Sequence, residues 1–441
     1  MADSIGKFVE RQKADGVEYL RFEFPDMHGT SRLKVVPIDK VEGYARKGLN
    51  MYGGVLALDT ASSVVPGAKL NEEVRYSDCT LFPDLDTVQT IPWLDKTARV
   101  ICDAHLGGRP IAASPRWVLQ QQLAEADKMG FRVVMGHEFE FYWLTAEEHQ
   151  PLFNGVHIFN NVRNQWIPEI DLLLDMLRQT GIDIITHNCE YAASQFEINY
   201  GPGVGLAGAD KAFTFKNAVK EIVHRLGYHA TFMSKPWGDR AGSGCHYHVS
   251  LWDKKTGKNM FLDKKGRHGL SAVCTSFVQG VLDHAPAMMP LINPTPNCYH
   301  RLKPHTFAPS NISWGVEDRS ALVRVKATGD EATHIEMRAA AAISNPYLTA
   351  SAVLAAGLLG IKAKAKIQET SADVPSEDNP KFAKFAPNLE RALADLEADK
   401  EMAKLLGPDL VHVFTTVKRY ELARFHAHIT DWERSEYMDV Y

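Results

Sequence analysis

The sequence predicts an α+β protein with a small, strand-rich N-terminal domain and a larger domain that mixes helices and strands. The chain has 441 residues, which is too long for one small core and suits two or three domains. Short runs of alternating apolar and polar residues fill the first hundred positions, whereas longer helical patterns alternate with strands after residues 110–114. We therefore predict two domains, at residues 1–107 and 108–441.

The N-terminal domain is expected to consist mainly of short strands. Residues 17–37 alternate apolar and polar residues on both sides of a Pro-Asp-Met-His-Gly turn, which is typical of a β-hairpin. A single helix is expected over residues 39–47. Further short strands are expected over 51–58, 78–82, 87–92 and 98–104.

The larger domain begins with a predicted helix and strand. Ser114 and Pro115 are good N-cap and first helical residues, and Gly130 ends the helical pattern just before a strand over 133–144. Helices are then expected around 164–181 and 209–227, with a strand ending at His187 between them. Strand pairs and a helix starting near Asn345 follow. A candidate flexible linker over 369–380 precedes two charged helices and a tail.

Composition excludes several classes of partner. The net charge of −5 gives no basic field for nucleic acid or an anionic membrane. The six cysteines lack the spacing of a disulfide framework, and the N-terminus lacks a secretory signal, so we expect a cytoplasmic protein. Residues 339–361 carry no charge over a length that could span a bilayer, but Asn345-Pro346 divides them with a helix start, which favours a buried helix.

The strand at 133–144 carries the first candidate site. Glu138 and Glu140 are two residues apart, so both carboxylates project from one face, while His137 and Phe139 point into packing. Two neighbouring carboxylates repel one another unless a cation lies between them. The alternative is an edge strand with a polar face.

Other segments place similar side chains on glycine-flanked strands. They supply Glu190 and Glu197, the row His246, His248 and Ser250 after a Gly-rich turn, and Glu336 with Arg338. A carboxylate-rich set with an occasional imidazole suits Mg²⁺ or Mn²⁺. Arginines beside such a site, here Arg301, Arg319, Arg324 and Arg338, suit phosphate or carboxylate substrates. These features indicate a metal-dependent phosphoryl-transfer enzyme, although no P-loop, kinase or dinucleotide motif is present.

The same motifs, in this order, resemble the glutamine synthetase family and its relatives that join glutamate to amines, especially the γ-glutamylamide synthetase branch. The resemblance runs over nearly the whole chain. The motifs are G-H-E-F-E-F, the Glu190–Glu197 pair, G-S-G-C-H-Y-H-V-S, N-C-Y-H-R-L-K-P, D-R-S-A-L-V-R, and I-E-M-R followed by N-P-Y-L.

The resemblance implies a role for each residue. It implies that one divalent ion is held by Glu140, Glu190 and Glu197, and a second, near the nucleotide phosphates, by Glu138, His246 and Glu336. Glutamate would be bound by Gly242, Arg301 and Arg338. ATP and the transferred phosphoryl group would be served by His248, Ser250, Arg319, Arg324 and the residue at His334.

The resemblance also implies a fold and an assembly. The fold is a β-grasp-like N-terminal domain with a large catalytic domain whose curved antiparallel sheet forms a funnel. Such proteins need ATP and two or more Mg²⁺ or Mn²⁺ ions per site, and form double-ring homo-oligomers, a dodecamer or a decamer, in which a neighbour's N-terminal domain completes each site.

Departures from the family pattern bear on the second substrate. Phe307 stands in K-P-H-T-F-A-P where ammonia-using members carry a glutamate, Ala241 replaces an Asn, and Ser194 replaces a Gly. An aromatic ring cannot bind ammonium or take its proton, so we expect an amine that carries a carbon group. The alternatives are a glutamine synthetase whose ammonium site is rebuilt from Asp59 or another acid, and, because His334 replaces an Arg, a non-catalytic glutamate sensor or structural ring.

Overall fold

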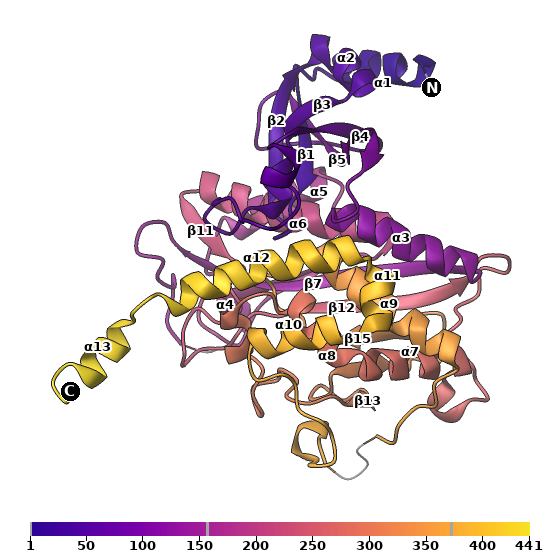
Figure 1. Ribbon diagram of the computed structural model, residues 1–441, viewed down its shortest axis with the longest axis vertical. Coiled ribbons are helices and arrows are strands. Elements are labelled where there is room, and N and C mark those ends of the chain that lie inside the picture. The colour runs from indigo at the N-terminus through magenta and orange to yellow at the C-terminus, as the bar shows by residue number, and fades with distance from the viewer. Residues whose placement is uncertain (1, 156–157, 371–373) are drawn as a thin grey trace.

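The computed structural model describes residues 2–155, 158–370 and 374–441, and its α+β fold confirms the predicted class (Figure 1). Two sheets organise the chain. The N-terminal sheet has the strand order β2-β1-β5-β4-β3, with β6 on β5, and the larger sheet has the order β13-β14-β15-β12-β7-β9-β8, with β10 and β11 on β7. The N-terminal sheet stands above the larger domain, and the C-terminal helix projects from the body towards the lower left (Figure 1).

The N-terminal domain contains the predicted hairpin and more helix than expected. The hairpin pairs β1 (Tyr19–Pro25) with β2 (Ser31–Pro37). Helix α1 (Ala2–Ala14) was not predicted. The other elements are α2 (Ile38–Lys47), β3 (Leu49–Tyr52), β4 (Asp78–Thr90), β5 (Thr97–Leu106) and β6 (Arg109–Pro110).

Two strand predictions in this domain were wrong in detail. The strand expected over 51–58 stops at Tyr52, and Gly53–Ala57 form a 3₁₀ helix. A Cβ atom on Gly54 would lie only 2.1 Å from Asn71 Oδ1, so this turn needs glycine. The strands expected over 78–82 and 87–92 are one strand, β4, whose register against β5 shifts between Asp84 and Gln89.

The larger domain alternates helices and strands as expected. Its first part contains α3 (Pro115–Lys128), β7 (Phe131–Thr145), α4 (Asn161–Asn164), α5 (Ile170–Gln179), β8 (Ile184–Cys189), β9 (Gln195–Tyr200), β10 (Gly203–Val204), α6 (Leu206–Arg225), β11 (Tyr228–Thr231) and β12 (Cys245–Asp253). Its second part contains α7 (Ala272–Asp283), α8 (Ala285–Ile292), β13 (Trp314–Val316), β14 (Val323–Lys326), β15 (His334–Met337) and α9 (Pro346–Ala363). The helix expected over 164–181 is α5, which begins later, at Ile170, and the separate short helix α4 ends at Asn164.

Helix α9 is the uncharged segment that could have been a membrane span. Among the described residues it is the one helix long and apolar enough to cross a bilayer, but 78% of its apolar window is buried inside the protein. Asn345 caps it, because its side-chain oxygen accepts the backbone N–H of Tyr347 at 3.0 Å. The helix packs against α3, α7 and α8, as expected for a core helix.

The C-terminal region has more helices than predicted. Helices α10 (Leu389–Ala398), α11 (Lys400–Leu406) and α12 (Pro408–His426) pack on the body, and α13 (Asp431–Tyr437) extends from it (Figure 1). Residues 371–373 of the expected linker lie outside the described residues. Further along that segment, Ser376 is buried and donates a hydrogen bond to Asp318 at 2.6 Å, so this part is anchored.

One arginine joins the N-terminal sheet to helices of the larger domain. Arg116 on α3 is fully buried and pairs with Asp84 on β4, Asp103 on β5 and Asp210 on α6, at 2.7, 2.8 and 2.9 Å. Strand β6 lies just past residue 107 and belongs to the N-terminal sheet, and the domain boundary at residue 107 remains a prediction.

Candidate active site

Strand β7 lies inside the larger sheet, so its interpretation as a polar edge strand was wrong. It pairs with β12 on one side and with β9 on the other. Its odd-numbered side chains from Val133 to Trp143 are buried, with Phe139 fully covered and stacked on Phe215 of α6 at 5.9 Å between ring centres. Glu138 and Glu140 therefore project from the opposite face.

The antiparallel register places the candidate ligands in rows across the sheet. In one row His248 lies opposite Glu336, and Glu336 lies opposite Arg324. In the next row Glu138 lies opposite His246. These pairings bring together residues that are almost two hundred positions apart in the chain.

A third row extends the cluster to β9. Glu140 lies opposite Glu197, and Asn188 of β8 lies opposite Glu197 on its other side. Glu190 follows directly after β8, where Asn188 donates to its carboxylate at 3.0 Å. Glu140 accepts the backbone N–H of Gly244 at 2.8 Å, which ties β7 to the Gly-rich turn.

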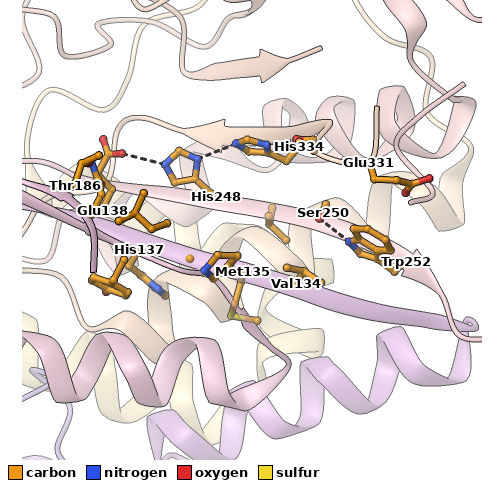
Figure 2. A pocket seen from close by; sticks show the side chains of 17 residues that line it. Val134, Met135, His137, Glu138, Thr186, His248, Ser250, Trp252, Glu331 and His334 are labelled. Carbon is orange, nitrogen blue, oxygen red and sulfur yellow. Dashed lines mark hydrogen bonds and ion pairs between the residues drawn. The ribbon is translucent and has the colours of Figure 1, made fainter. Parts of the chain in front are cut away.

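Glu138 lies at the centre of this cluster. Its carboxylate contacts His246 Nδ1 at 2.7 Å and His248 Nε2 at 3.6 Å. Figure 2 shows Glu138, His248 and His334 on one side of the strands and His137 on the other. Among the described residues, two groups place their ligand atoms within 4.8 Å of one another, namely Glu138 with His248 and Glu336, and Glu138 with Glu197 and His246.

The family resemblance assigns Glu138 to one ion only, whereas in the structure Glu138 belongs to both groups of candidate ligands. Glu140 and Glu190 fall outside them, although their charges act on Glu197. The assignment of individual ligands to two ions therefore remains a prediction.

Among the described residues, the carboxylates of Glu190 and Glu197 have no ion-pair partner. Burial, and then the charge of Glu140, raise the pKa of Glu190 to about 7. Burial, and then the charges of Glu138 and Glu140, also raise the pKa of Glu197. Buried oxygen ligands that repel one another fit a hard divalent cation, which removes the repulsion and suits Mg²⁺ or Mn²⁺.

The other side of the cluster is rich in positive charge. Burial alone would raise the pKa of Glu336, but His246 and Arg338 lower it to about 2. Arg324 donates to Glu336 at 3.0 Å and to Glu317 at 2.5 Å. The two ends of the site thus differ in charge. The carboxylate of Glu336, on β15, has cationic partners, whereas those of Glu190 and Glu197, next to and on β9, repel one another.

This polarity gives a prediction about metal and pH. The pKa values of Glu190 and Glu197 are raised in the folded protein without metal. Above pH 4.5, the ordinary pKa of a glutamate, these two carboxyl groups therefore keep protons in the folded protein that they lose in the unfolded chain. The stability of the metal-free protein should therefore fall as pH rises from 4.5 through neutral. Saturating Mg²⁺ or Mn²⁺ should raise the melting temperature by at least about 2 °C more at about pH 8 than at about pH 6.

Scanning calorimetry with metal and with chelator measures this difference. In Glu197→Gln the pH dependence should shrink, since one of the two raised carboxyls is gone. An equal metal-induced shift at both pH values in the unsubstituted protein would contradict the electrostatic account.

The predicted glutamate-binding residues surround the Gly-rich turn. Arg301 is buried and donates to the carbonyl oxygens of Arg338, Ala339 and Ala340. A Cβ atom on Gly242 would lie 2.9 Å from Arg301 Cγ, so glycine allows this close approach. Arg338 pairs with Glu336 and donates to the carbonyl oxygen of Phe307 at 3.3 Å.

A cavity of about 460 Å³ opens beside the cluster (Figure 2). Glu138, His248, Ser250 and His334 line it, and Trp252 donates to Ser250 at 2.9 Å. His248 and His334 are in contact through Nδ1 and Nε2 at 3.1 Å. Four of the residues expected near the nucleotide or its metal therefore share one cavity wall.

Phe307 and Tyr191 form an aromatic pair at the cluster's other end. The Phe307 side chain is 67% exposed, its φ is +57°, and its ring centre lies 6.3 Å from that of Tyr191. Tyr191 directly follows Glu190, and its backbone N–H donates to the Glu190 carboxylate at 3.2 Å. Arg319 is exposed on the loop whose carbonyl oxygen accepts a bond from Arg338.

Comparison with known proteins gives the family. Residues 112–437 match the family described as "Glutamine synthetase, catalytic domain". The chain belongs to the glutamine synthetase family. It is 33% identical to a glutamine synthetase of Halobacterium salinarum over 100% of this chain and 98% of that one, and 30% identical to a glutamate–isopropylamine ligase of a Pseudomonas species over 99% and 97%. A solved structure of GmaS with ADP, 29% identical, covers 98% of this chain and 99% of its own, with a TM-score of 0.88.

Sequence reasoning missed several residues of this family member's site. Tyr191, Asn188 and Glu317 each touch an expected site residue, but none is a defining position of a motif. A lone tyrosine or asparagine carries no periodic signal. The alternation of β8 could have placed Asn188 opposite Glu197, had the register been known.

Ser194, a departure from the family pattern, and Asp59, the candidate acid of a rebuilt ammonium site, are both tied into the fold. Ser194 is buried and donates a hydrogen bond to the carbonyl oxygen of Trp143 at 2.5 Å. Asp59 is buried, accepts backbone N–H groups of Ala61 and Ser63 and pairs with Arg424. Its oxygens are therefore engaged within the chain.

Proposed function

We propose that this protein is an ATP-dependent ligase that joins the side-chain carboxylate of L-glutamate to an amine bearing an apolar carbon group. The product would be a γ-glutamyl amide. The observation that carries the choice of amine is Phe307, which presents an exposed ring against Tyr191 where ammonia-using family members carry a glutamate.

The first half of the reaction would use the β7–β12–β15 cluster. Glu138, Glu140, Glu190, Glu197, His246 and Glu336 would hold two or more Mg²⁺ or Mn²⁺ ions. When bound, these ions neutralise charge on the phosphates of ATP during transfer. His248, Ser250 and His334 would orient the nucleotide in the 460 Å³ cavity, with Arg319 and Arg324 serving the transferred phosphoryl group.

Glutamate would lie between this cluster and the Gly-rich turn. Arg338 is held by Glu336 and the Phe307 carbonyl oxygen, and Arg301 by three carbonyls, so both guanidinium groups have fixed orientations. Fixed donors position the substrate carboxylate for in-line attack on the γ-phosphoryl group, giving γ-glutamyl phosphate and ADP. The amine nitrogen would then displace phosphate.

The amine would enter past Tyr191 and Phe307. Two aromatic rings bind apolar groups but offer no base for an ammonium ion. A weakly basic amine such as an arylamine is already neutral near pH 7 and needs no such base. Two relatives, the glutamate–isopropylamine ligase of Pseudomonas and GmaS, a gamma-glutamylmethylamide synthetase, are named for amines other than ammonia, which supports such an amine here.

The second candidate is a glutamine synthetase that uses ammonia. It is favoured by the several relatives that carry this name. An ammonium site rebuilt from Asp59 would require that carboxylate to leave Arg424 and its own turn. A non-catalytic glutamate sensor is the third possibility, and it would bind glutamate without releasing ADP when Mg²⁺ and every amine are supplied.

We also propose that the protein forms a double-ring homo-oligomer, a dodecamer or a decamer. Support comes from the C-terminal segment that projects from the body with helix α13 (Figure 1), where Ile429, Trp432 and Met438 are each at least 60% exposed. Large apolar side chains exposed on a projecting segment are often covered by a partner.

Phe307→Glu should shift the enzyme towards ammonia. A carboxylate at this position can bind ammonium and accept its proton, so we expect kcat/KM for ammonia to rise by about tenfold or more, with an equal or larger loss for arylamines. Phe307→Leu, which keeps apolar surface, is the matched control and should retain the amine preference. Steady-state ADP release measures both. A rise for arylamines in Phe307→Glu would refute the assignment.

A further inference from the structure

A second cavity lies on the reverse side of β7, away from the catalytic cluster. Its volume is about 400 Å³, and its walls come from the β1–β2 turn, α6, β11, the start of α9, and α12. Phe139, whose neighbours Glu138 and Glu140 face the active site, lies with its ring centre 5.8 Å from Lys216 Nζ of this cavity. The strand therefore separates the two cavities.

The cavity carries a surplus of positive charge. Lys216, Lys220 and Lys418 line it, and among the described residues no aspartate or glutamate does. Glu421 compensates part of this charge, because it pairs with Lys418 at 2.9 Å and with His28 at 2.7 Å.

Lys216 and Lys220 carry the uncompensated part. They are four residues apart on α6 and so share one face of the helix. Lys216 is buried and donates to the carbonyl oxygens of Ile343 and Ser344, at 2.7 and 3.0 Å. Its Nζ atom lies 5.8 Å from the ring centre of Phe139 and 5.7 Å from that of Phe232. Burial lowers the pKa of Lys216 to about 7, as expected for an ammonium group without an anionic partner.

The remaining walls combine apolar surface with another source of positive potential. Apolar side chains cover much of the lining, namely Met27, Phe232, Leu291, Leu348 and Phe414. Asn345, the first residue before α9, also lines the cavity, so the positive end of an 18-residue helix lies beside it. A charged head group and an apolar body would both find partners here.

We propose that this cavity is a binding site for a small organic carboxylate, with its head group between Lys216 and Lys220 and its apolar body against Phe232, Leu291 and Phe414. The site is separate from the catalytic one and needs neither nucleotide nor glutamate. Its occupant would compete with neither substrate.

Isothermal titration of the full-length protein with straight-chain carboxylates from acetate to octanoate tests this proposal. Affinity should rise with chain length until the cavity is filled, and hexanamide, which lacks the charge, should bind at least about tenfold more weakly than hexanoate. Inorganic phosphate forms a second arm. Phosphate binding without any dependence on carboxylate chain length would overturn the apolar part of the proposal.

Substitutions at the rim of the cavity test whether hexanoate binds there. Lys220 is exposed at the rim, so Lys220→Gln and Lys220→Glu should fold normally and weaken hexanoate binding, by about tenfold or more for the charge reversal. Lys255→Glu, on a distant exposed turn, is the matched control and should bind like the unsubstituted protein. Equal affinity in Lys220→Glu, or displacement of hexanoate by glutamate or ATP, would overturn the proposal. Neither result depends on the identity of the amine.

Discussion

Glu138→Ala should lose phosphoryl transfer, with kcat for ADP release falling on the order of a thousandfold, or about 4 kcal/mol of transition-state stabilisation. Glu138 belongs to both groups of candidate metal ligands, and its carboxylate holds both His246 and His248. Its removal leaves the imidazoles of His246 and His248 without their carboxylate partner. Each of the two groups of candidate metal ligands also loses one oxygen ligand.

Glu140→Ala is the informative comparison. Glu140 lies on the same strand face but is bound to the Gly244 backbone, next to the turn that is expected to bind glutamate. We expect its loss to raise KM for glutamate more than it lowers kcat. Glu147→Ala, on the exposed loop after β7, should leave both constants unchanged. Indistinguishable defects in Glu138→Ala and Glu140→Ala would contradict this division.

Arg116→Ala should destabilise the fold by about 3–5 kcal/mol. The guanidinium group is fully buried and neutralises Asp84 and Asp103 of the N-terminal sheet and Asp210 of α6. Removing it leaves three carboxylates without their cation and a void where the side chain packed. We therefore expect the N-terminal sheet to separate from α6 before the larger domain unfolds.

Urea unfolding followed by tryptophan fluorescence measures this loss. Arg178→Ala, on the exposed face of α5, is the control and should change stability by less than about 0.5 kcal/mol. A similar small change in Arg116→Ala would show that the buried cluster contributes little to holding the N-terminal sheet against α6.

The sequence was most informative where strand alternation and glycine positions constrain the backbone. The even-numbered side chains of β7, the row after the Gly-rich turn of β12, and the pair on β15 were each placed on a face by spacing alone. Asn345 was identified as a helix cap because Asn followed by Pro is a strong start signal.

Long-range register was not predictable from spacing. Nothing local to Glu138 or His246 says that they are paired, because the register is set by a sheet whose strands are scattered over two hundred residues. The assignment of Glu138 to one ion rested on the family resemblance; in the structure its carboxylate lies in both groups of candidate ligands, and the division between ions stays a prediction. Arg116 was missed for a related reason, since its three partners lie in separate elements.

Local conformation also overrode strand propensity in the N-terminal domain. Residues 53–57 are apolar enough for a strand, but they form a 3₁₀ helix. In this turn Gly54 lies so close to the side chains of Asn71 and Tyr52 that there is no room for a Cβ atom. The approach of the 71–76 segment fixes this turn, and that contact has no signature in the 51–58 sequence.

The claim that Phe307 and Tyr191 select an amine with an apolar group is tested most directly by ADP release. The enzyme, with glutamate, ATP and Mg²⁺, would be supplied in parallel with ammonia, small alkylamines, polyamines and anilines. The account predicts faster turnover with alkylamines or anilines than with ammonia, and formation of the matching γ-glutamyl amide. Turnover supported by ammonia alone would contradict it.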